Sequence, residues 1–256
     1  MTLIWSTHDG SSRFYAMDSF DLLRSIESDS VPLVWTDPPF FLSNGGTVCS
    51  SGKRVSVNKG DWDRSNGAIA DHEFNLNWLK ECYRVLKPNG IIWVCGSHHN
   101  IYSVGFAMQI LEFRLLNHIT WEKPSPPPNL GCRCFTHSAE FLLFATKAKQ
   151  GSKHQYCFNY ADVKDENGGK QQKDVWRISP PRKWEKKHGS YPAQKPVELV
   201  TKALSATTNP GDLVLDPFAG SSTTGVAALS IGRNYLGCDS NPKAIELSRR
   251  RLLEYS

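Results

Sequence analysis

Residues 213–239, LVLDPFAGSSTTGVAALSIGRNYLGCD, constrain the fold more than any other stretch of the chain. An apolar run leads into a turn of small residues, a helical segment follows over about 222–231, and a second apolar run ends at Asp239. A strand, such a turn, a helix and a second strand form the first half of a nucleotide-binding α/β unit. Asp239 follows Asp216 by 23 residues, close to the separation expected of an acid that holds two ribose hydroxyls. This stretch therefore predicts a parallel sheet that binds a nucleoside.

The rest of the chain continues the alternation of strands and helices, which is typical of a mostly parallel, twisted α/β sheet. Apolar runs predict strands at 31–36, 91–95, 115–121, 141–145, 213–215 and 235–238. Periodicity and capping signals predict helices at 71–86, 101–111, 196–206, 222–231 and 242–253, the first capped by Asp71 and ended by Lys87-Pro-Asn-Gly. Residues 43–70 show neither period and predict a long loop, of the kind that is usually functional or mobile.

The charge of the chain is concentrated in one segment. The net charge is +5, but residues 147–187 hold eleven Lys and Arg against five acids, so this segment carries +6 and the remainder −1. A basic insert on a nearly neutral body favours a polyanionic partner, and a solvated lysine-rich surface is the alternative.

Other classes of site and location are disfavoured. No apolar run reaches the roughly 18 residues of a membrane span, and the N-terminus has no basic segment followed by an apolar one, so we expect a cytoplasmic protein without a membrane partner. The pair Cys132-x-Cys134, with His137 nearby, is too tightly spaced for a zinc knuckle and has no second pair. We therefore predict no metal site.

The glycine-containing turn favours one nucleoside ligand over another. A dinucleotide site prefers Gly-x-Gly-x-x-Gly, which places a pyrophosphate at the helix N-terminus, whereas the turn here is Phe218–Ser222. S-adenosylmethionine has a ribose and no phosphate, so it fits this turn better than NAD. The alternative is a strand–helix turn that needs small residues only for packing.

A second motif, WTDPPF at residues 35–40, ends another apolar run with an acid, two prolines and an aromatic residue. Together with LDPFAGSSTTG it resembles the amino-methyltransferases of DNA, which carry a catalytic Asp/Asn/Ser-Pro-Pro-Tyr/Phe loop and a Phe-x-Gly-x-Gly cofactor loop. The order of the motifs is similar to the β group, whose His-Pro-Thr-Gln-Lys-Pro and short acidic motifs resemble YPAQKP (191–196) and MDSFDLL (17–23). The resemblance covers essentially the whole chain and implies a Rossmann-like, S-adenosylmethionine-dependent methyltransferase fold.

The chemistry of such a reaction explains the catalytic loop. The lone pair of an exocyclic amino nitrogen is delocalised into the ring, and acceptors for its two N–H groups would free that lone pair. The Asp37 carboxylate and the Pro38 carbonyl can be those acceptors. Pro38 and Pro39 fix φ and remove donors. Phe40 can stack on a base that has left the duplex.

The resemblance also implies a cofactor shell. Asp18 would accept from the cofactor's adenine amino group or, alternatively, only cap a helix at 19–26. Phe218 would contact the adenine ring, and Asp239 the ribose. The remaining members, near the methionine portion or on the turn, are Lys195, Asp216, Ala219, Gly220, Ser221, Thr223 and Thr224. Ser222 replaces the family's second glycine, and Tyr191 and Ala193 replace the usual His and Thr.

The target base follows from the resemblance alone. DPPF is typical of adenine-N6 enzymes, and the segments FFLSNGG (40–46), GDWD (60–63), HNIYSVG (99–105), CFTHS (134–138) and NGGKQQKDVW (167–176) resemble the small GATC-modifying, DpnA-like enzymes of restriction–modification systems. Adenine-N6 methylation in GANTC and cytosine-N4 methylation stay open, as does an S-adenosylmethionine-dependent methyltransferase acting on RNA or protein.

We expect three regions: a catalytic part at 1–146, a basic target-recognition region at 147–190, and an S-adenosylmethionine-binding part at 191–256. The partner would be DNA, double-stranded and in some cases single-stranded. The resemblance allows a homodimer and a cognate restriction endonuclease that the enzyme need not contact. Candidate DNA contacts are Gln171, Gln172, Arg177, Lys183, Lys186 and Lys187, and a solvated side chain is the alternative for each.

Overall fold

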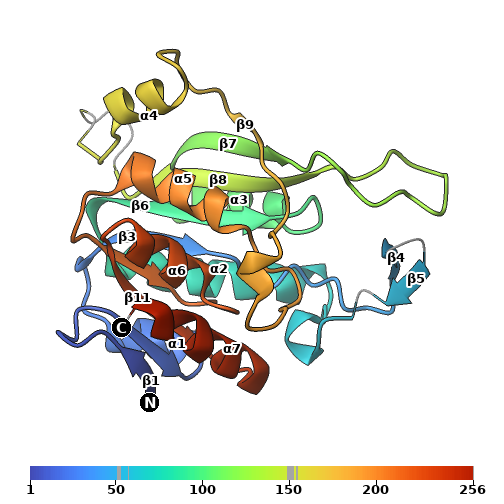
Figure 1. The fold of residues 1–256 in the computed structure, drawn as a ribbon, viewed down its shortest axis with the longest axis horizontal. Helices are drawn as coiled ribbons and strands as arrows, with labels where there is room; N and C mark the ends of the chain where they lie inside the picture. Colours follow the sequence, from blue (N-terminus) through green and yellow to red (C-terminus); the bar gives the residue numbers. More distant parts are fainter. Residues whose placement is uncertain (51–52, 57, 149–152, 154, 256) are drawn as a thin grey trace.

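A computed structural model describes the chain except residues 51–52, 57, 149–152, 154 and 256. Its main feature is a sheet whose strand order is β1-β2-β11-β10-β3-β6-β8-β7-β9 (Figure 1). The strands are β1 (Thr2–Ser6), β2 (Arg13–Ala16), β3 (Val31–Thr36), β6 (Leu86–Gly96), β7 (Arg114–Glu122), β8 (Ala139–Thr146), β9 (Val175–Arg177), β10 (Leu213–Asp216) and β11 (Asn234–Asp239).

The centre of this sheet is parallel and its flanks are mixed. Strands β2, β11, β10, β3 and β6 pair in parallel, whereas β1–β2, β6–β8 and β8–β7 are antiparallel. The chain moves from β3 outward to β6 on one side and from β10 outward to β11 on the other. Ligands of open α/β sheets bind outside the carboxyl ends of the strands at such a switch point, so β3 and β10 should flank the site.

Helices cover both faces of the sheet, and the strands alternate between two cores. Leu33 and Trp35 of β3 pack with one cluster, under α5 (Val197–Thr207), α6 (Thr223–Ser230) and α7 (Pro242–Leu252). Val34 packs with the other, under α1 (Ser19–Ser25), α2 (Ala68–Val85) and α3 (Ile101–Ile110). A strand buried on both faces reads as a continuous apolar run, which is why the sequence revealed it. The predicted Rossmann-like, largely parallel fold is confirmed.

Several local predictions were wrong. The predicted loop at 43–70 contains a separate hairpin, β4 (Thr47–Ser50) and β5 (Lys53–Ser56), followed by the 3-10 turn η1 (Asp61–Asp63). Helix α2 starts before Asp71, whose carboxylate accepts from Ser65 Oγ and the Asn66 amide rather than capping the helix. Lys87-Pro-Asn-Gly ends α2 as predicted but lies inside β6.

The basic segment also contributes to the sheet. It contains helix α4 (Tyr160–Glu166), strand β9 and the 3-10 turn η2 (Trp184–Lys186). Strand β9 pairs in parallel with β7, and its Trp176 is buried with its ring centroid 5.9 Å from that of Trp93. The segment is therefore anchored in the core by one aromatic side chain. None of the helices in the described part of the chain is long and apolar enough to cross a membrane.

Candidate active site and cofactor pocket

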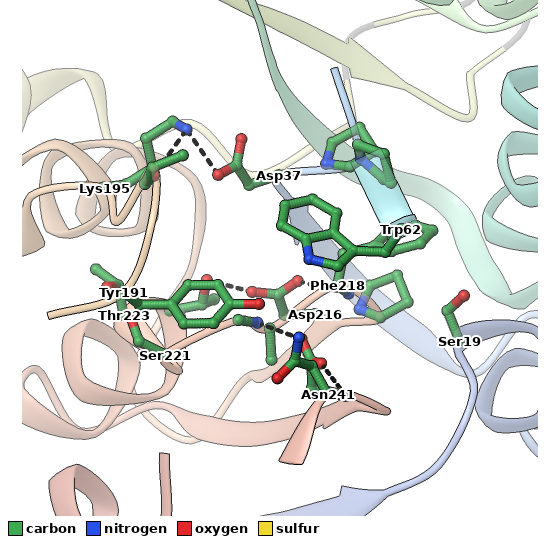
Figure 2. A pocket seen from close by; sticks show the side chains of 18 of the residues that line it. Ser19, Asp37, Trp62, Tyr191, Lys195, Asp216, Phe218, Ser221, Thr223 and Asn241 are labelled. Carbon is green, nitrogen blue, oxygen red and sulfur yellow. Dashed lines mark hydrogen bonds and ion pairs between the residues drawn. The ribbon is translucent and has the colours of Figure 1, made fainter. Parts of the chain in front are cut away.

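A cavity of about 400 Å³ opens where β3, β10 and β11 end (Figure 2). Its walls come from the segments that follow these strands, from Met17–Ser19, from the Tyr191–Lys195 segment, and from Lys59 and Trp62. All four predicted catalytic residues and all ten predicted cofactor residues line it. Segments as far apart in sequence as Met17 and Asn241 therefore share one space, because parallel strands bring their carboxyl ends to the same edge of the sheet.

One wall of the cavity is a charged cluster around Lys195. Its ammonium nitrogen lies 2.6 Å from Asp37 Oδ2 and 3.5 Å from Glu140 Oε2, and the side chain is only 5% exposed. Lys123 donates to the same glutamate. Asp37 Oδ1, by contrast, has no hydrogen-bond partner in the described residues, although it is shielded from solvent. A carboxylate with one paired and one unused oxygen is prepared to accept a donor from a substrate.

The ionisation of this cluster is set by burial and by Lys195. Burial raises the pKa of Asp37, and the Lys195 charge and hydrogen bond offset part of that rise. For Glu140 the balance is opposite: burial would raise its pKa, but Lys195 and Lys123 outweigh burial and lower it. Burial alone would lower the pKa of Lys195, and the two carboxylates raise it instead. Lys195 therefore stays protonated and keeps negative charge at the cavity wall.

The aromatic residue of the catalytic loop lies among cations. Lys195 Nζ is 4.9 Å and Lys59 Nζ 5.1 Å from the centroid of the Phe40 ring, within the range of cation–π attraction. The backbone of the loop is reached by Asn100, whose Nδ2 lies 3.4 Å from the carbonyl oxygen of Pro39. This contact is to Pro39, whereas the sequence argument uses the carbonyl of Pro38.

The opposite wall is the loop after β10, held by the carboxylates of Asp216, which is buried, and Asp239, which is half-buried. Asp239 accepts the amide of Gly220 through Oδ2 (2.9 Å) and the amide of Asn241 through Oδ1 (2.8 Å). Asp216 accepts the amide of Phe218 (3.1 Å) and the hydroxyl of Thr224 (2.5 Å). Figure 2 shows Asp216 and Asn241 below Asp37, with Trp62 beside the space between Asp37 and Asp216.

Burial raises the pKa of both carboxyls. The pKa of Asp216 rises to about 7 and that of Asp239 to about 6, and the hydrogen bonds they accept offset only part of the effect of burial. A ligand that donates a hydrogen bond to the carboxylate of Asp216 or of Asp239 would favour the ionised form of that carboxylate. Ribose hydroxyls are such donors, so the chemistry of Asp239 suits a nucleoside.

The loop has a shape that only small residues allow. Gly220 has φ +53°, and a Cβ there would lie 3.2 Å from the Tyr191 ring. Ser222, which stands where the family has glycine, also has a left-handed φ of 53°, and its hydroxyl lies 3.2 Å from that of Tyr235. A serine in this conformation is strained by about 1 kcal/mol relative to glycine, and the buried hydroxyl contact helps to hold it.

Sequence reasoning missed the residue that supports this loop from behind. Nη1 of Arg251, on α7, donates to the carbonyl of Ser221 (2.6 Å), to its hydroxyl (2.8 Å) and to Thr223 Oγ1 (3.0 Å). Arg251 is 5% exposed, and burial lowers its pKa. Its neighbours Arg249 and Arg250 pair with Glu246 at the surface, so the sequence RRR gives no sign of which arginine points inward.

The predicted adenine contacts lie on the third side of the cavity. Phe218 packs edge-on against Trp78, with centroids 5.7 Å apart, which fixes the ring at the cavity wall. Asp18 caps α1 by accepting the amide of Phe20 at 2.8 Å, so it does serve as a helix cap. Asp18 also lines the cavity. Trp62 lines it as well, contributed by the segment that was predicted as a structureless loop.

These residues fit S-adenosylmethionine. A cavity of about 400 Å³ falls in the range of small-molecule sites. It offers an acid for the ribose, an aromatic ring for the adenine, and at Gly220 a backbone surface that a side chain would block. Lys195, along the wall, can meet the carboxylate end of an amino acid.

The predicted DNA contacts lie in different parts of the structure. The strand register places the start of β9 level with the end of β6: Val175 pairs with Thr120 of β7, Thr120 pairs with Phe141 of β8, and Phe141 pairs with Gly96, the last residue of β6. Strand β9 runs in the same direction as β6 and therefore continues past its carboxyl end. Arg177, the last residue of β9, thus lies on the side of the sheet where the cavity opens. Gln171 and Gln172 line a different cavity of about 300 Å³ among aromatic side chains, and Gln172 Oε1 accepts from Lys202 at 3.1 Å.

The three remaining predicted DNA contacts, Lys183, Lys186 and Lys187, lie on or next to η2, which a buried acid holds close to the active site. Glu185, 5% exposed, accepts the amides of Arg182 (2.9 Å) and Val197 (2.8 Å), so η2 is fixed to the first turn of α5, just after Lys195. Lys183 and Lys186 are exposed on this turn, whereas Lys187 pairs with Glu254 at 2.7 Å. This buried glutamate within a basic run had no sequence signal of its own.

Several known proteins resemble this chain in sequence and in fold. The N6/N4 DNA methylase family matches residues 31–250. The type II methyltransferase M2.LlaDCHI of Lactococcus lactis subsp. cremoris is 48% identical over 92% of this chain and 87% of its own length, and M2.DpnII of Streptococcus pneumoniae is 47% identical over the same shares. The crystal structure of an M1.HpyAVI–SAM complex matches with a TM-score of 0.66 and 26% identity, over 93% of this chain and 98% of the other. The match covers the catalytic loop, the cofactor loop and the sheet between them, and the chain belongs to the N6/N4 family of S-adenosylmethionine-dependent DNA methylases.

Proposed function

We propose that this DNA methylase transfers the methyl group of S-adenosylmethionine to N6 of adenine in GATC, as the modification enzyme of a restriction–modification system. The observation that carries the chemistry is Asp37 Oδ1, which has no hydrogen-bond partner in the described residues and belongs to a side chain that lines the same cavity as Asp239. The observation that favours adenine is the DPPF sequence, and GATC rests on the resemblance of residues 40–46 and 167–176 to GATC-modifying enzymes.

Each residue of the catalytic loop has a proposed role. Asp37 Oδ1 accepts one N–H of the target amino group, and the Pro38 carbonyl accepts the other, so the nitrogen lone pair turns toward the methyl donor. Bound S-adenosylmethionine supplies an electrophilic methyl group on sulfur. Phe40 stacks on the extruded base. The positive charge of Lys195 favours the ionised form of Asp37, and the burial of the Lys195 side chain strengthens this contact.

The cofactor roles are assigned to the other walls. Asp239 accepts the ribose hydroxyls, Phe218 packs on the adenine ring, and Asp18 accepts from the adenine amino group beside its own cap bond. Ala219, Gly220 and Ser221 present the backbone to the methionine portion. Asp216, Thr223 and Thr224 maintain the loop, and Lys195 lies between the cofactor and Asp37.

The proposed DNA surface surrounds the mouth of the cavity. Lys183, Lys186 and Arg177 lie toward this side and would contact phosphates, which position the duplex without reading its sequence. Gln171 and Gln172 line the separate aromatic cavity, so they are proposed as base readers only where the duplex extends over that face. We also propose a cytoplasmic location, where DNA and the methyl donor meet, and a cognate endonuclease acting on the same sequence.

A homodimer is part of the proposal and is supported by α3. Tyr102, Phe106 and Ile110 occupy one face of this helix, at i, i+4 and i+8, and are 72%, 58% and 49% exposed. A second copy would cover such a face. Light scattering should give twice the chain mass, and Phe106→Glu should give the monomer mass; a monomeric wild type would contradict this part.

The test of the target is expression in a host that lacks GATC methylation, followed by digestion of its DNA. A nuclease that cuts only unmodified GATC should fail, and one that cuts only N6-methylated GATC should succeed. N6-methyladenine mapped to GANTC, or N4-methylcytosine, would replace the target and leave the enzyme class intact. Methylation of RNA or protein without methylation of DNA would overturn the proposal.

A further inference from the structure

The base of the β4–β5 hairpin is tied to the catalytic loop by a single buried carboxylate, Asp63. Its Oδ1 accepts the amides of Phe40 (2.9 Å) and Phe41 (2.9 Å), and its Oδ2 accepts the Ser43 hydroxyl (2.9 Å) and, at 3.3 Å, the Leu42 amide. The side chain has no exposed surface. Four consecutive residues that begin with the last residue of DPPF therefore share one acceptor group.

Hydrogen bonds run in both directions between residues 40–43 and residues 59–63. The carbonyl of Asp63 accepts the amide of Ser43 at 2.9 Å, and Ser43 Oγ accepts the amide of Lys59 at 2.8 Å. Lys59 also reaches over the Phe40 ring. Residues 40–43 and 59–63 thus form one unit at the base of the hairpin, which projects away from the sheet (Figure 1).

This unit holds a strained backbone. Phe41 has φ +59°, a left-handed conformation that is unfavourable for any residue with a side chain. Its amide donates to Asp63 Oδ1, and its ring packs edge-on against Phe74 at 5.7 Å. A backbone in this conformation persists only where its surroundings impose it, and strain of this kind concentrates at functional sites. Without the carboxylate, the turn that aims Phe40 and the preceding prolines would relax.

We infer that Asp63 is a positioning residue for methyl transfer, which couples the β4–β5 hairpin to the DPPF loop. The inference rests on the proposed function of that loop. Asp63 does not line the cavity, so it acts through the backbone of Phe40 and Phe41 rather than on the substrate or the cofactor. A hairpin displaced by bound DNA would move Asp63, and with it the acceptors for the target amino group.

The test compares Asp63→Asn and Asp63→Ala with Asp61→Asn. Asp61 lies two residues away on the same turn and is exposed, which makes it a matched control. The asparagine keeps one acceptor oxygen but presents an N–H₂ group to backbone donors, and alanine removes both oxygens. Single-turnover methylation should fall about 10- to 100-fold for Asp63→Asn, and further for Asp63→Ala, since misplacement by about 1 Å has effects of this size. Asp61→Asn should stay within about twofold of wild type.

Two further readouts separate positioning from general damage. S-adenosylmethionine Kd should stay within about threefold of wild type, since the cofactor's proposed anchors lie elsewhere. The fluorescence of 2-aminopurine at the target position should still rise on binding, but the methylation step that follows should be slow. If the Asp63 variants do not fold, Ser43→Ala removes one of the four donors to Asp63, together with the acceptor for the Lys59 amide, and should reduce kcat by about 3- to 10-fold.

The outcomes are distinct. Wild-type turnover in Asp63→Asn, or in Ser43→Ala, would overturn the inference, as would an equal loss of cofactor affinity and of turnover. Failure of the wild type to methylate GATC would instead contradict the proposed target, and the same comparison would then be made on the sequence that it does methylate.

Discussion

The ammonium nitrogen of Lys195 lies 2.6 Å from Asp37 Oδ2, although 158 residues separate the two along the chain. The first comes from the segment before α5 and the second from the residue after β3. The contact joins the DPPF loop to the segment that leads into α5, across the edge of the sheet. It also leaves Asp37 Oδ1 as the oxygen without a partner in the described chain.

Asp37→Asn should reduce methyl transfer by about 100- to 1000-fold, because the amide cannot supply a charged acceptor to the target amino group. The cofactor's ribose and adenine sites lie on other walls, so S-adenosylmethionine affinity should change little. Asparagine is a better replacement for Asp37 than alanine, because alanine would leave the buried charge of Lys195 without a polar partner at this position. Single-turnover kinetics and calorimetric titration measure the two quantities; unchanged turnover in the folded variant would contradict the role of Asp37.

Cofactor affinity should depend on pH through Asp239. Its pKa in the free protein is raised to about 6 by burial, and ribose hydroxyls bind the ionised form. Affinity should therefore weaken by up to about tenfold as the pH falls from 7 to 5, because the ionised fraction falls by that factor. Asp239→Asn should bind weakly and lose this pH dependence.

Stability of the free protein should show the opposite trend. Both carboxyls have pKa values above their ordinary values in the folded state, so the folded protein binds more protons than the unfolded chain between about pH 4 and 7. The free energy of unfolding should fall as the pH rises through this window. Urea denaturation without cofactor at several pH values measures it, and a rise through the window in wild type that Asp216→Asn abolishes would contradict the sign.

Arg251→Met should weaken S-adenosylmethionine binding by about tenfold and lower the free energy of unfolding by about 2–4 kcal/mol, because three hydrogen bonds from a charged donor are lost. Arg250→Met is the control, since Arg250 is exposed and pairs with Glu246 on the surface. Calorimetry and denaturant unfolding should show the difference between these adjacent residues. Equal behaviour of the two variants would remove the supporting role of Arg251.

The double variant Lys183→Ala/Lys186→Ala should weaken DNA binding and flatten its salt dependence, with the log–log slope reduced by about 1 for each lost phosphate contact. Lys187→Ala should have a smaller effect, because this lysine is paired with Glu254. A pair on other elements, Lys80 on α2 and Lys87 in β6, serves as the charge-matched control. Identical slopes for the two double variants would show that η2 is only a solvated surface.

The sheet could be predicted because most of its central strands are buried on both faces. Leu33, Val34 and Trp35 form an apolar run that no helix period explains, and the acids at the carboxyl ends of such strands then meet by topology alone. Two of the elements that were missed gave too weak a signal: β5 is Lys53–Ser56, with the sequence KRVS, and β9 is three residues long. Strand β9 also depends on a distant partner, β7.

The same limit applies to the site. Asp37, Asp239 and Gly220 could be predicted because chemistry restricts which residues can stand there. Asp63 and Glu185 could not, because each is a buried acid that satisfies backbone amides, and its burial follows from the path of the chain rather than from its neighbours in sequence. Arg251 is indistinguishable from Arg250 until α7 is placed on the cofactor loop.

The pairing of β9 with β7 bears on how sequence specificity can be exchanged between enzymes of this kind. The segment that carries the positive charge cannot be swapped as a free cassette from residue 147 to 190, because Trp176 fills part of the core and its indole donates to the Lys173 carbonyl at 3.0 Å. A chimaera would keep 173–178 and Glu185 from the recipient and graft only the residues on either side. Among enzymes with different target sequences, substitutions should then accumulate in the residues on either side of β9, while β9 itself changes slowly.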